Sequence, residues 1–449
     1  MDGDRFHDFH DWWSERARAN RFEVTGIPFS QLSGWRFVAE SGNLAHVSGR
    51  FFSVEGLHVE ADGLGSWHQP VLNQPEIGIL GILVRDVGGV PHALMQAKME
   101  PGNVNNLQLS PTVQATRSNH TRAHRGSNTR YLEYFRRPGP GRTLLDTLQS
   151  EHGAWFWQKR NRNMVVQVTG DVPVHDDYRW LPLRQVHRLL KVDNLVNMDT
   201  RSVLACLPPS AVGEHVQPPA DPFTAALHRS YTGLRPGLHA MGEVLSWFTE
   251  AKTRCEWTAR PIPLAHVRDW SRTDDEIADD GGERFRIVAV RVRADSREVS
   301  NWTQPLLAPR GQGLAAFLVR PFDGVLHVLV RARSEPGLLE LVEMGPTVRL
   351  PAAGGPASEP YAGEAAAAPS GRVRFDAVLS EEGGRFHHAL TRYRVIEVAD
   401  DFPADVPDDF LWLTVHQLMR LVRHGRYLNV EARSLLACLH GLRDGLPSE

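Results

Sequence analysis

The feature that most constrains the fold of this 449-residue chain is an internal duplication. The segment ILVRDVGGVPHALMQAKMEPG, which begins at Ile82, returns 235 residues later as FLVRPFDGVLHVLVRARSEPG from Phe317. The same separation relates WHQP at Trp67 to WTQP at Trp302. An unbroken register over so long a segment indicates two copies of one domain, since a solenoid array would need many shorter units.

The register resumes after a divergent stretch in two further pairs: SEHGAWF from Ser150 with SEEGGRF from Ser380, and SVLACL from Ser202 with SLLACL from Ser434. We therefore predict an N-terminal repeat at residues 1–210 and a C-terminal repeat at 222–449. The residues between them, 211–221, are rich in proline and are expected to form a linker. Two domains also suit the chain length, because one hydrophobic core rarely holds so many residues.

Composition narrows the function classes. The formal net charge of -3 provides no basic field for nucleic acid. The three cysteines, Cys206, Cys255 and Cys438, form neither a disulfide framework nor a Cys-x-x-Cys metal motif, which favours a reducing compartment. No apolar run approaches the roughly 18 residues of a membrane helix. We expect a cytoplasmic protein without nucleic-acid or membrane partners.

The repeated segment predicts a β-hairpin in each copy. Two apolar runs are separated by Gly88-Gly89 in the first copy and by Asp323-Gly324 in the second, and such pairs favour two-residue hairpin turns. Side chains alternate along a strand, so Gln96 and Lys98 share the face opposite to the flanking apolar residues. One face is expected to enter the core, and the other to face solvent or a pocket.

Helices are expected around these strands because apolar residues recur every three or four positions in four segments. These are FHDFHDWWSERARA (6–19), HAMGEVLSWFTEAKTR (239–254), RWLPLRQVHRLLKV (179–192) and FLWLTVHQLMRLVRH (410–424). The mixture of sheet and flanking helices predicts an α+β domain that occurs twice.

The two copies differ most after residue 113. The first continues as QATRSNHTRAHRGSNTRYLEYFRR (114–137), whereas the second becomes a segment rich in Ala, Gly and Pro. Upstream, Lys98 is replaced by Arg333, while Glu100 is retained as Glu335. If only one copy needs to work, the altered residues are the candidates for function and the retained ones for scaffold.

The run LMQAKMEPGNVNNLQLSPTVQATRSN, with the W-x-Q-P motif and the duplicated layout, resembles the NDP-hexose 2,3-dehydratase family of deoxysugar biosynthesis. The resemblance covers nearly the whole chain. It implies an α+β fold of two duplicated Nudix-like domains, each a mixed β-sheet flanked by helices. It also implies a homodimer, a dTDP-4-keto-6-deoxy-D-glucose substrate, one productive pocket and one remnant, and a product that passes to a 3-ketoreductase.

The implied reaction removes the C2 hydroxyl as water while C3 becomes a carbonyl, which is redox-neutral and requires in principle neither a cofactor nor a metal. The site must supply a base for the C3 proton, an acid for the leaving hydroxyl and a group that stabilises the enolate. The catalytic candidates are His120, Lys98 and Glu100. The candidates for binding the substrate are Trp67, Gln96, Arg117, Asn119, Thr121, Arg122 and Tyr131.

Each candidate has an alternative role. His120 competes with His124 as the imidazole base, and either histidine could be structural. Lys98 suits enolate stabilisation more than proton abstraction. Glu100 could instead anchor the Glu-Pro-Gly turn, because the second copy keeps it. The arginines of residues 114–137 could form a solvated face.

Three functions remain open from the sequence. The first is the 2,3-dehydratase, a lyase whose site lies in the N-terminal repeat. The second is a Nudix-type nucleotide-sugar pyrophosphohydrolase, although the acidic magnesium-binding helix motif of those enzymes is not found. The third is a non-catalytic protein that binds nucleotide sugars. Metal dependence separates the first two, and consumption of the 4-keto sugar separates the first from the third.

Overall fold

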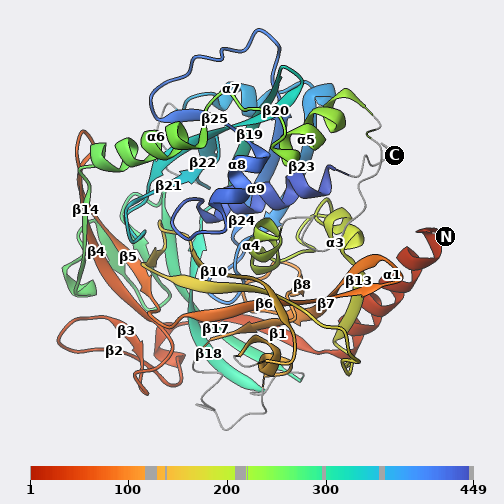
Figure 1. Ribbon diagram of the computed structural model, residues 1–449. Helices are drawn as coiled ribbons and strands as arrows, with labels where there is room; N and C mark the ends of the chain where they lie inside the picture. The colour runs from red at the N-terminus through yellow and green to blue at the C-terminus, as the bar shows by residue number, and fades with distance from the viewer. Residues whose placement is uncertain are drawn as a thin grey trace.

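Each repeat builds a seven-stranded mixed main sheet, and two smaller sheets lie beside them in the computed structural model (Figure 1). The structure describes residues 2–116, 129–136, 139–207, 219, 221–295, 300–352 and 359–443. Among these residues, none of the helices is both long and apolar enough to cross a bilayer.

The two main sheets have the same strand order, which confirms the duplication. The N-terminal sheet contains β6 (Gly78–Val87), β7 (Val90–Met99), β8 (Leu107–Ser110), β9 (Val113–Ala115), β10 (Arg142–Ser150), β12 (Arg160–Gln167) and β13 (Tyr178–Pro182). The C-terminal sheet contains β19 (Gln312–Phe322), β20 (Val325–Ser334), β21 (Val342–Gly345), β22 (Val348–Leu350), β23 (Val373–Ser380), β24 (Leu390–Glu397) and β25 (Phe410–Thr414). Each sheet contains one parallel strand pair, which is β6 with β12 in the N-terminal sheet and β19 with β24 in the C-terminal sheet. The other neighbouring strands are antiparallel. The predicted α+β class is confirmed, and the Nudix-like assignment stays a prediction.

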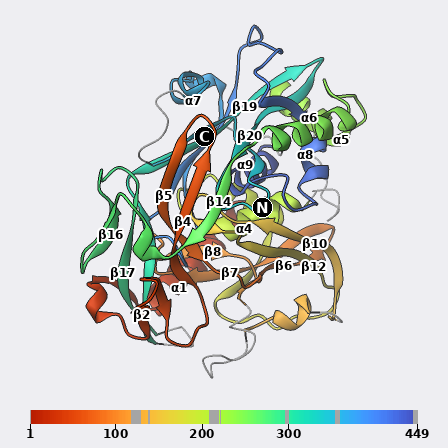
Figure 2. The ribbon, with the colours of Figure 1, turned by 90° about the vertical axis from the view of Figure 1, so that its left-hand side faces the viewer.

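The smaller sheets exchange one strand between the repeats. One sheet contains β1 (Phe22–Ile27), β15 (Trp270–Arg272), β16 (Glu276–Asp279), β17 (Phe285–Ala294) and β18 (Asn301–Pro309). The other contains β2 (Trp35–Phe37), β3 (Leu44–His46), β4 (Ser53–Ala61), β5 (Gly65–Asn73), β11 (Phe156–Trp157) and β14 (Thr258–Ile262). N-terminal β1 pairs with C-terminal β17 (Figure 1), and C-terminal β14 pairs with N-terminal β4 (Figure 2). The repeats are therefore interlocked.

Both predicted hairpins are present. β6 and β7 pair across Gly88-Gly89, and β19 and β20 pair across Asp323-Gly324, with positive φ at all four turn residues. Such a pair of left-handed residues matches the twist of the flanking strands. The predicted faces of β7 are also confirmed, because Ala93, Met95, Ala97 and Met99 enter the core.

The helices are α1 (Asp2–Ala19), α3 (Leu183–Leu189), α4 (Met198–Cys206), α5 (Pro222–Thr232), α6 (Met241–Arg254), α7 (Ala362–Ala366), α8 (Val415–Leu421) and α9 (Val430–Gly441), with 3₁₀ turns η1 (Phe29–Gln31), η2 (Leu132–Phe135), η4 (Leu264–His266) and η5 (Ser370–Arg372). The predicted helices at 6–19 and 239–254 are confirmed by α1 and α6. The prediction was wrong for the first halves of 179–192 and 410–424, which form β13 and β25. These strands pair with β7 and β20, and that pairing outweighed the local helical periodicity.

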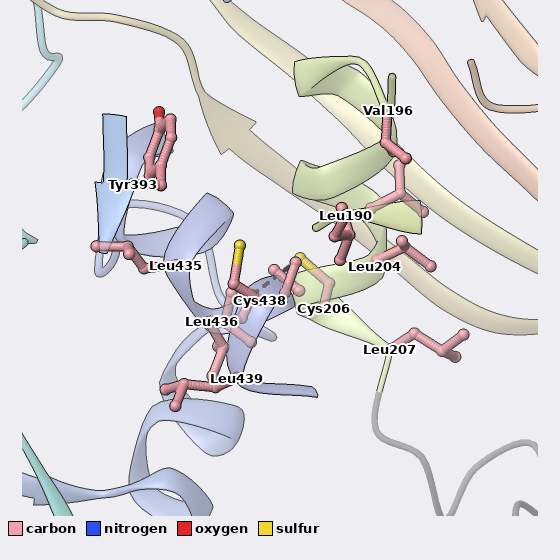
Figure 3. Packing of buried hydrophobic residues seen from close by; sticks show 14 of the residues in the cluster. Leu190, Val196, Leu204, Cys206, Leu207, Tyr393, Leu435, Leu436, Cys438 and Leu439 are labelled. Atoms are coloured by element: carbon pink, nitrogen blue, oxygen red, sulfur yellow. Dashed lines mark hydrogen bonds between the residues drawn. The ribbon is translucent and has the colours of Figure 1, made fainter. Parts of the chain in front are cut away.

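The core between the repeats is built on α4 and α9, both of which are buried along their whole length. Figure 3 shows Cys206 of α4 lying beside Cys438 of α9, and Leu204 and Leu436 belong to the same buried cluster. The apolar side chains of this cluster exclude water from the contact, which stabilises the two repeats as one body.

Two fully buried arginines cross this contact in opposite directions. Arg201 of α4 donates to Ser434 Oγ at 3.2 Å and to the Ser380 carbonyl at 2.8 Å. Arg433 of α9 donates to Ser202 Oγ at 3.0 Å and to the Ser150 carbonyl. Each guanidinium thus satisfies polar groups of the other repeat, as a buried charge requires. This explains why the Arg-Ser pair recurs in both copies.

The retained Pro-Gly turns are explained by close backbone contacts between the repeats. A Cβ atom on Gly102 would lie 1.6 Å from the Phe386 carbonyl oxygen, and one on Gly337 would lie 1.8 Å from that of Phe156. No residue with a side chain fits at these distances. Each repeat therefore places its Glu-Pro-Gly turn against a loop of the other repeat.

Candidate functional site

A cavity of about 1020 Å³ lies between the N-terminal main sheet and the small sheet of the C-terminal repeat. We call it the main cavity. Gln96 and Lys98 of β7 and Asp199 of α4 line it from the N-terminal side. Trp302 and Gln304 of β18 line it from the C-terminal side, together with the loop at residues 382–385. The exchange of β1 and the crossed loops hold both surfaces in place, so the main cavity belongs to both repeats.

A buried polar chain begins at the predicted residue Lys98. Its ammonium group lies 3.1 Å from Glu100 Oε1. Glu100 is 5 % exposed, and its Oε1 also accepts a hydrogen bond of 3.0 Å from Gln114 Nε2. Asn197, the N-cap residue of α4, donates to Gln114 Oε1 at 3.2 Å. The chain fixes the rotamers of Lys98 and Glu100, as a preorganised site requires.

Two further carboxyl groups face the main cavity. Glu382 is half-buried and lines the main cavity. Burial raises its pKa to about 7. Asp199 is fully buried, and its pKa is raised well above the usual range by burial and then by Glu382, Glu151 and Glu100. Asp199 Oδ1 and Glu382 Oε2 have no hydrogen-bond partner among the described residues. An uncompensated buried polar atom is costly, so its retention in a cavity indicates a functional role.

Two cations accompany these carboxyl groups. Burial lowers the pKa of Lys159, whose ammonium group donates to the Glu76 carbonyl. Arg385 donates to Gln74 Oε1 at 3.0 Å, and its guanidinium lies 4.3 Å from the centre of the Phe52 ring. They place positive charge in the main cavity, where it can stabilise an anionic substrate or intermediate.

The mouth of the main cavity carries an aromatic wall. Trp35 packs against Phe52 with ring centres 4.8 Å apart, and Phe51 and Trp302 also line the main cavity. Arg130 and Arg291 line the same opening. Aromatic rings with arginines nearby are the groups that bind a nucleoside diphosphate, the base by stacking and the phosphates by paired hydrogen bonds.

A family model described as NDP-hexose 2,3-dehydratase matches residues 6–207 and 241–439. The chain belongs to the NDP-hexose 2,3-dehydratase family. It is 51% identical over 446 residues to a dTDP-4-dehydro-6-deoxy-alpha-D-glucopyranose 2,3-dehydratase of Saccharopolyspora spinosa, which covers 97% of this chain and 91% of that protein. It is 49% identical over 447 residues to one of Streptomyces violaceoruber, with 97% of each chain covered. A third, of Amycolatopsis orientalis, is 47% identical over 449 residues, with 97% and 90% covered.

The structure brings together three of the residues that the sequence proposed for this member of the NDP-hexose 2,3-dehydratase family: Gln96, Lys98 and Glu100. Trp67 does not line the main cavity. It packs against Trp257 in the other small sheet, and its repeat counterpart Trp302 lines the main cavity instead. The residues Arg117, Asn119, His120, Thr121, Arg122, His124 and Arg125 lie outside the described residues, and their predicted roles stay predictions.

Tyr131 also lies away from the main cavity. Its hydroxyl donates to the Pro173 carbonyl at 2.7 Å, and its ring packs against Tyr178 with centres 4.8 Å apart. Burial raises its pKa. In this position the side chain anchors the start of η2, and Tyr178, its packing partner, lines the main cavity.

Sequence reasoning did not select Asp199, Glu382 or Arg385. Asp199 could have been noticed as an acidic residue at the start of the apolar segment MDTRSVLACL. Glu382 aligns with His152, so the comparison of the copies contained this difference as well. It was missed because the candidate residues were chosen from the N-terminal repeat alone, although a contribution from the C-terminal repeat was left open.

The equivalent place in the C-terminal repeat is filled by ion pairs. We call this group the twin cluster: His152, Arg333, Glu335, Arg349, Glu359, Glu381 and Glu431. Arg349, the counterpart of Gln114, lies 3.2 Å from Glu335 and 2.8 Å from Glu431. Arg333, the counterpart of Lys98, lies 2.5 Å from Glu359.

These ion pairs shift the pKa values of the groups in the twin cluster. Burial acts to lower the pKa of His152, but Glu381 and Glu431 outweigh it and raise this pKa to about 10. Burial acts to raise the pKa of Glu431, yet Arg349 and His152 hold it far below its usual value. At neutral pH the twin cluster therefore consists of fixed ions, which are poor proton donors and acceptors there.

Proposed function

We propose that this protein removes water across C2 and C3 of dTDP-4-keto-6-deoxy-D-glucose and yields the 3,4-diketo-2,6-dideoxy sugar, as a lyase. The names of its relatives support this substrate. The observation that carries the proposal is the main cavity, which is lined by the Lys98–Glu100 pair and by Asp199 and Glu382. Each of these two carboxyl groups has one oxygen without a hydrogen-bond partner among the described residues. The main cavity thus combines cationic and carboxyl groups, as elimination next to a ketone requires.

In the proposed mechanism the C4 ketone acidifies the C3 hydrogen, and a carboxylate removes it. The enolate that forms carries negative charge on O4. Lys98 stabilises this charge, because an ammonium group in a site of low dielectric acts strongly on charge that develops during the reaction. Loss of the C2 hydroxyl as water then gives an enol, which tautomerises to the C3 ketone.

The nucleotide is assigned to the mouth of the main cavity, where aromatic rings and arginines gather. The thymine ring stacks against the wall of Trp35 and Phe51, and Arg130 or Arg291 binds the diphosphate. This places the hexose against Lys98 and Glu382 at the inner end. The predicted arm around His120 and Arg117 remains a candidate for additional contacts.

Incubation of the purified protein with dTDP-4-keto-6-deoxy-D-glucose tests the proposal. Mass spectrometry should detect loss of one water, followed by release of dTDP as the unstable diketo sugar decomposes. A 3-ketoreductase with its reduced nicotinamide should trap the intact product. Formation of dTMP and a sugar phosphate would indicate the pyrophosphohydrolase, and binding without consumption would indicate a non-catalytic protein.

The oligomeric state, the enzyme that consumes the product and the cellular location are proposed from the family resemblance. We assign a homodimer, a 3-ketoreductase as the consumer of the product, and a cytoplasmic location. Sedimentation of the purified chain tests the first assignment. The coupled reductase assay tests the second, because an unstable diketo sugar must be reduced before it decomposes.

A further inference from the structure

We infer that Glu382, supplied by the C-terminal repeat, is the base that takes the C3 proton, and that Asp199 is the acid that protonates the departing C2 hydroxyl. This assignment rests on the proposed function. It adds two catalytic residues to that function and gives the C-terminal repeat a part in the reaction.

The position of Glu382 supports the first role. It lies beside Gly384: a Cβ atom placed on that glycine would be 3.2 Å from Glu382 Oε1 and 3.7 Å from Glu100 Oε1. The two carboxyl groups thus approach the same point, and Lys98 lies beside them because it pairs with Glu100 at 3.1 Å. A substrate whose O4 contacts Lys98 would present its C3 hydrogen on this side. Glu382 Oε2 has no partner among the described residues, so it can accept a proton.

The position of Asp199 supports the second role. It lies in the first turn of α4, is 2 % exposed and lines the main cavity, and its buried Oδ1 has no hydrogen-bond partner in the described part of the chain. Burial raises the pKa of Asp199 well above its usual value, and Glu382, Glu151 and Glu100 raise it further, which favours the protonated form of this carboxyl group. A protonated carboxyl is a donor, as a leaving hydroxyl requires.

The twin cluster provides the contrast. There, His152 occupies the position of Glu382, and Glu431, which occupies that of Asp199, pairs with both Arg349 and His152. A buried carboxylate without a counterion is strongly unfavourable, so its neutralisation is the stable arrangement. Among the described residues, neither Glu382 nor Asp199 forms such an ion pair, although Arg385 lies close enough to lower the pKa of Glu382. This difference from the twin cluster is expected if the two acids must titrate.

Glu382 and Asp199 act in turn during the proposed elimination. Glu382 takes the C3 proton, and the C3–H electron pair forms the C3–C4 double bond while O4 becomes anionic. The enolate then re-forms the C4 carbonyl, a double bond forms between C2 and C3, and the C2–O bond breaks as its oxygen takes the proton of Asp199. Water leaves, and a proton moves from the C3 hydroxyl to C2. Proton transfer from Glu382 to Asp199 restores the starting state.

Turnover by the full-length chain tests both roles. Glu382→Gln and Asp199→Asn should each lower kcat by about 10²- to 10⁴-fold while KM changes little. In deuterated buffer, Asp199→Asn should still incorporate deuterium at C3 of recovered substrate, because the base is intact. Glu382→Gln should not. The wild-type kcat should decline as the pH falls below about 7, and Glu382→Gln should lose this dependence.

Glu364→Gln, at an exposed carboxylate of the C-terminal repeat, is the matched control and should leave kcat unchanged. Glu382→Asp keeps a carboxyl group and serves if the amide variant does not fold; a lower kcat with the same pH dependence is expected. Wild-type kcat in either Glu382 variant, or deuterium at C3 with Glu382→Gln, overturns the assignment. Failure of the wild-type protein to consume substrate would contradict the proposed function instead.

Discussion

The main cavity and the twin cluster descend from one ancestral site, and they differ in how their carboxyl groups are neutralised. Glu100 and Glu335 occupy the same position, yet Glu100 pairs with a lysine at the edge of a cavity and Glu335 with Arg349 inside a filled cluster. The replacement of Gln114 by Arg349 and of Glu382 by His152 accounts for most of this difference. Under the proposed function, added counterions, and not a change of scaffold, distinguish the twin cluster from the main cavity.

The largest effect is expected where a counterion of the twin cluster is removed. Arg349→Gln leaves Glu335 and Glu431 buried without their guanidinium, which should lower the free energy of unfolding by about 3–5 kcal/mol. Chemical denaturation measures this change. The remaining folded protein should keep its kcat, and a loss of kcat without a loss of stability would show that the twin cluster takes part in the reaction.

A smaller effect, on kcat alone, is expected from Lys98→Met. The substitution removes the positive charge that is proposed to stabilise O4 of the enolate, and it should therefore lower kcat by about 10²- to 10³-fold. Steady-state kinetics measures the loss. Arg333→Lys changes the repeat counterpart and should leave kcat unchanged; equal losses in the two variants would remove the distinction between the sites.

Glu382→Gln should also change how stability depends on pH. The folded protein holds a proton on Glu382 up to pH about 7, whereas an exposed glutamate loses it near 4.5. Because the folded state binds more protons in this window, this group makes stability fall as pH rises from 4.5 to 7. The variant should lose that slope and exceed the wild type by a few °C in Tm at pH 8. Parallel melting curves would contradict the raised pKa.

The smallest effect is expected from Gly384→Ala, which installs the residue that the other repeat has at Ala154. The methyl group would lie 3.2 Å from Glu382 Oε1 at the wall of the main cavity. It should restrict that carboxylate and lower kcat/KM by about tenfold or less. Ala154→Gly is the matched control, and an effect on kcat/KM from this control alone would reverse the assignment of the two sites.

Sequence reasoning predicted the elements that depend on local signals. The hairpins at Gly88-Gly89 and Asp323-Gly324 were predictable, because two left-handed residues in a row restrict the turn type. The alternation on β7 correctly placed Lys98 opposite the core. β13 was not predictable in the same way, because it pairs with β7, a strand that is distant in sequence.

The candidate site was predictable only in part, for a related reason. Lys98 and Glu100 lie on a strand and turn whose pattern the sequence contains, whereas Glu382 reaches the main cavity through the crossed loops at Gly102 and Gly383. The exchange of β1 and β14 likewise places Trp302, and not Trp67, at the site. Neither the crossing of the loops nor the exchange of the strands is indicated by a local sequence pattern.

The central claim is tested most directly by the turnover of Gln114→Arg. The introduced guanidinium should pair with Glu100 and Asp199, as Arg349 pairs with Glu335 and Glu431, and so convert the main cavity into a second twin cluster. The account predicts that dehydration of dTDP-4-keto-6-deoxy-D-glucose falls by at least about 10²-fold while Tm rises. Wild-type turnover by this variant would contradict it.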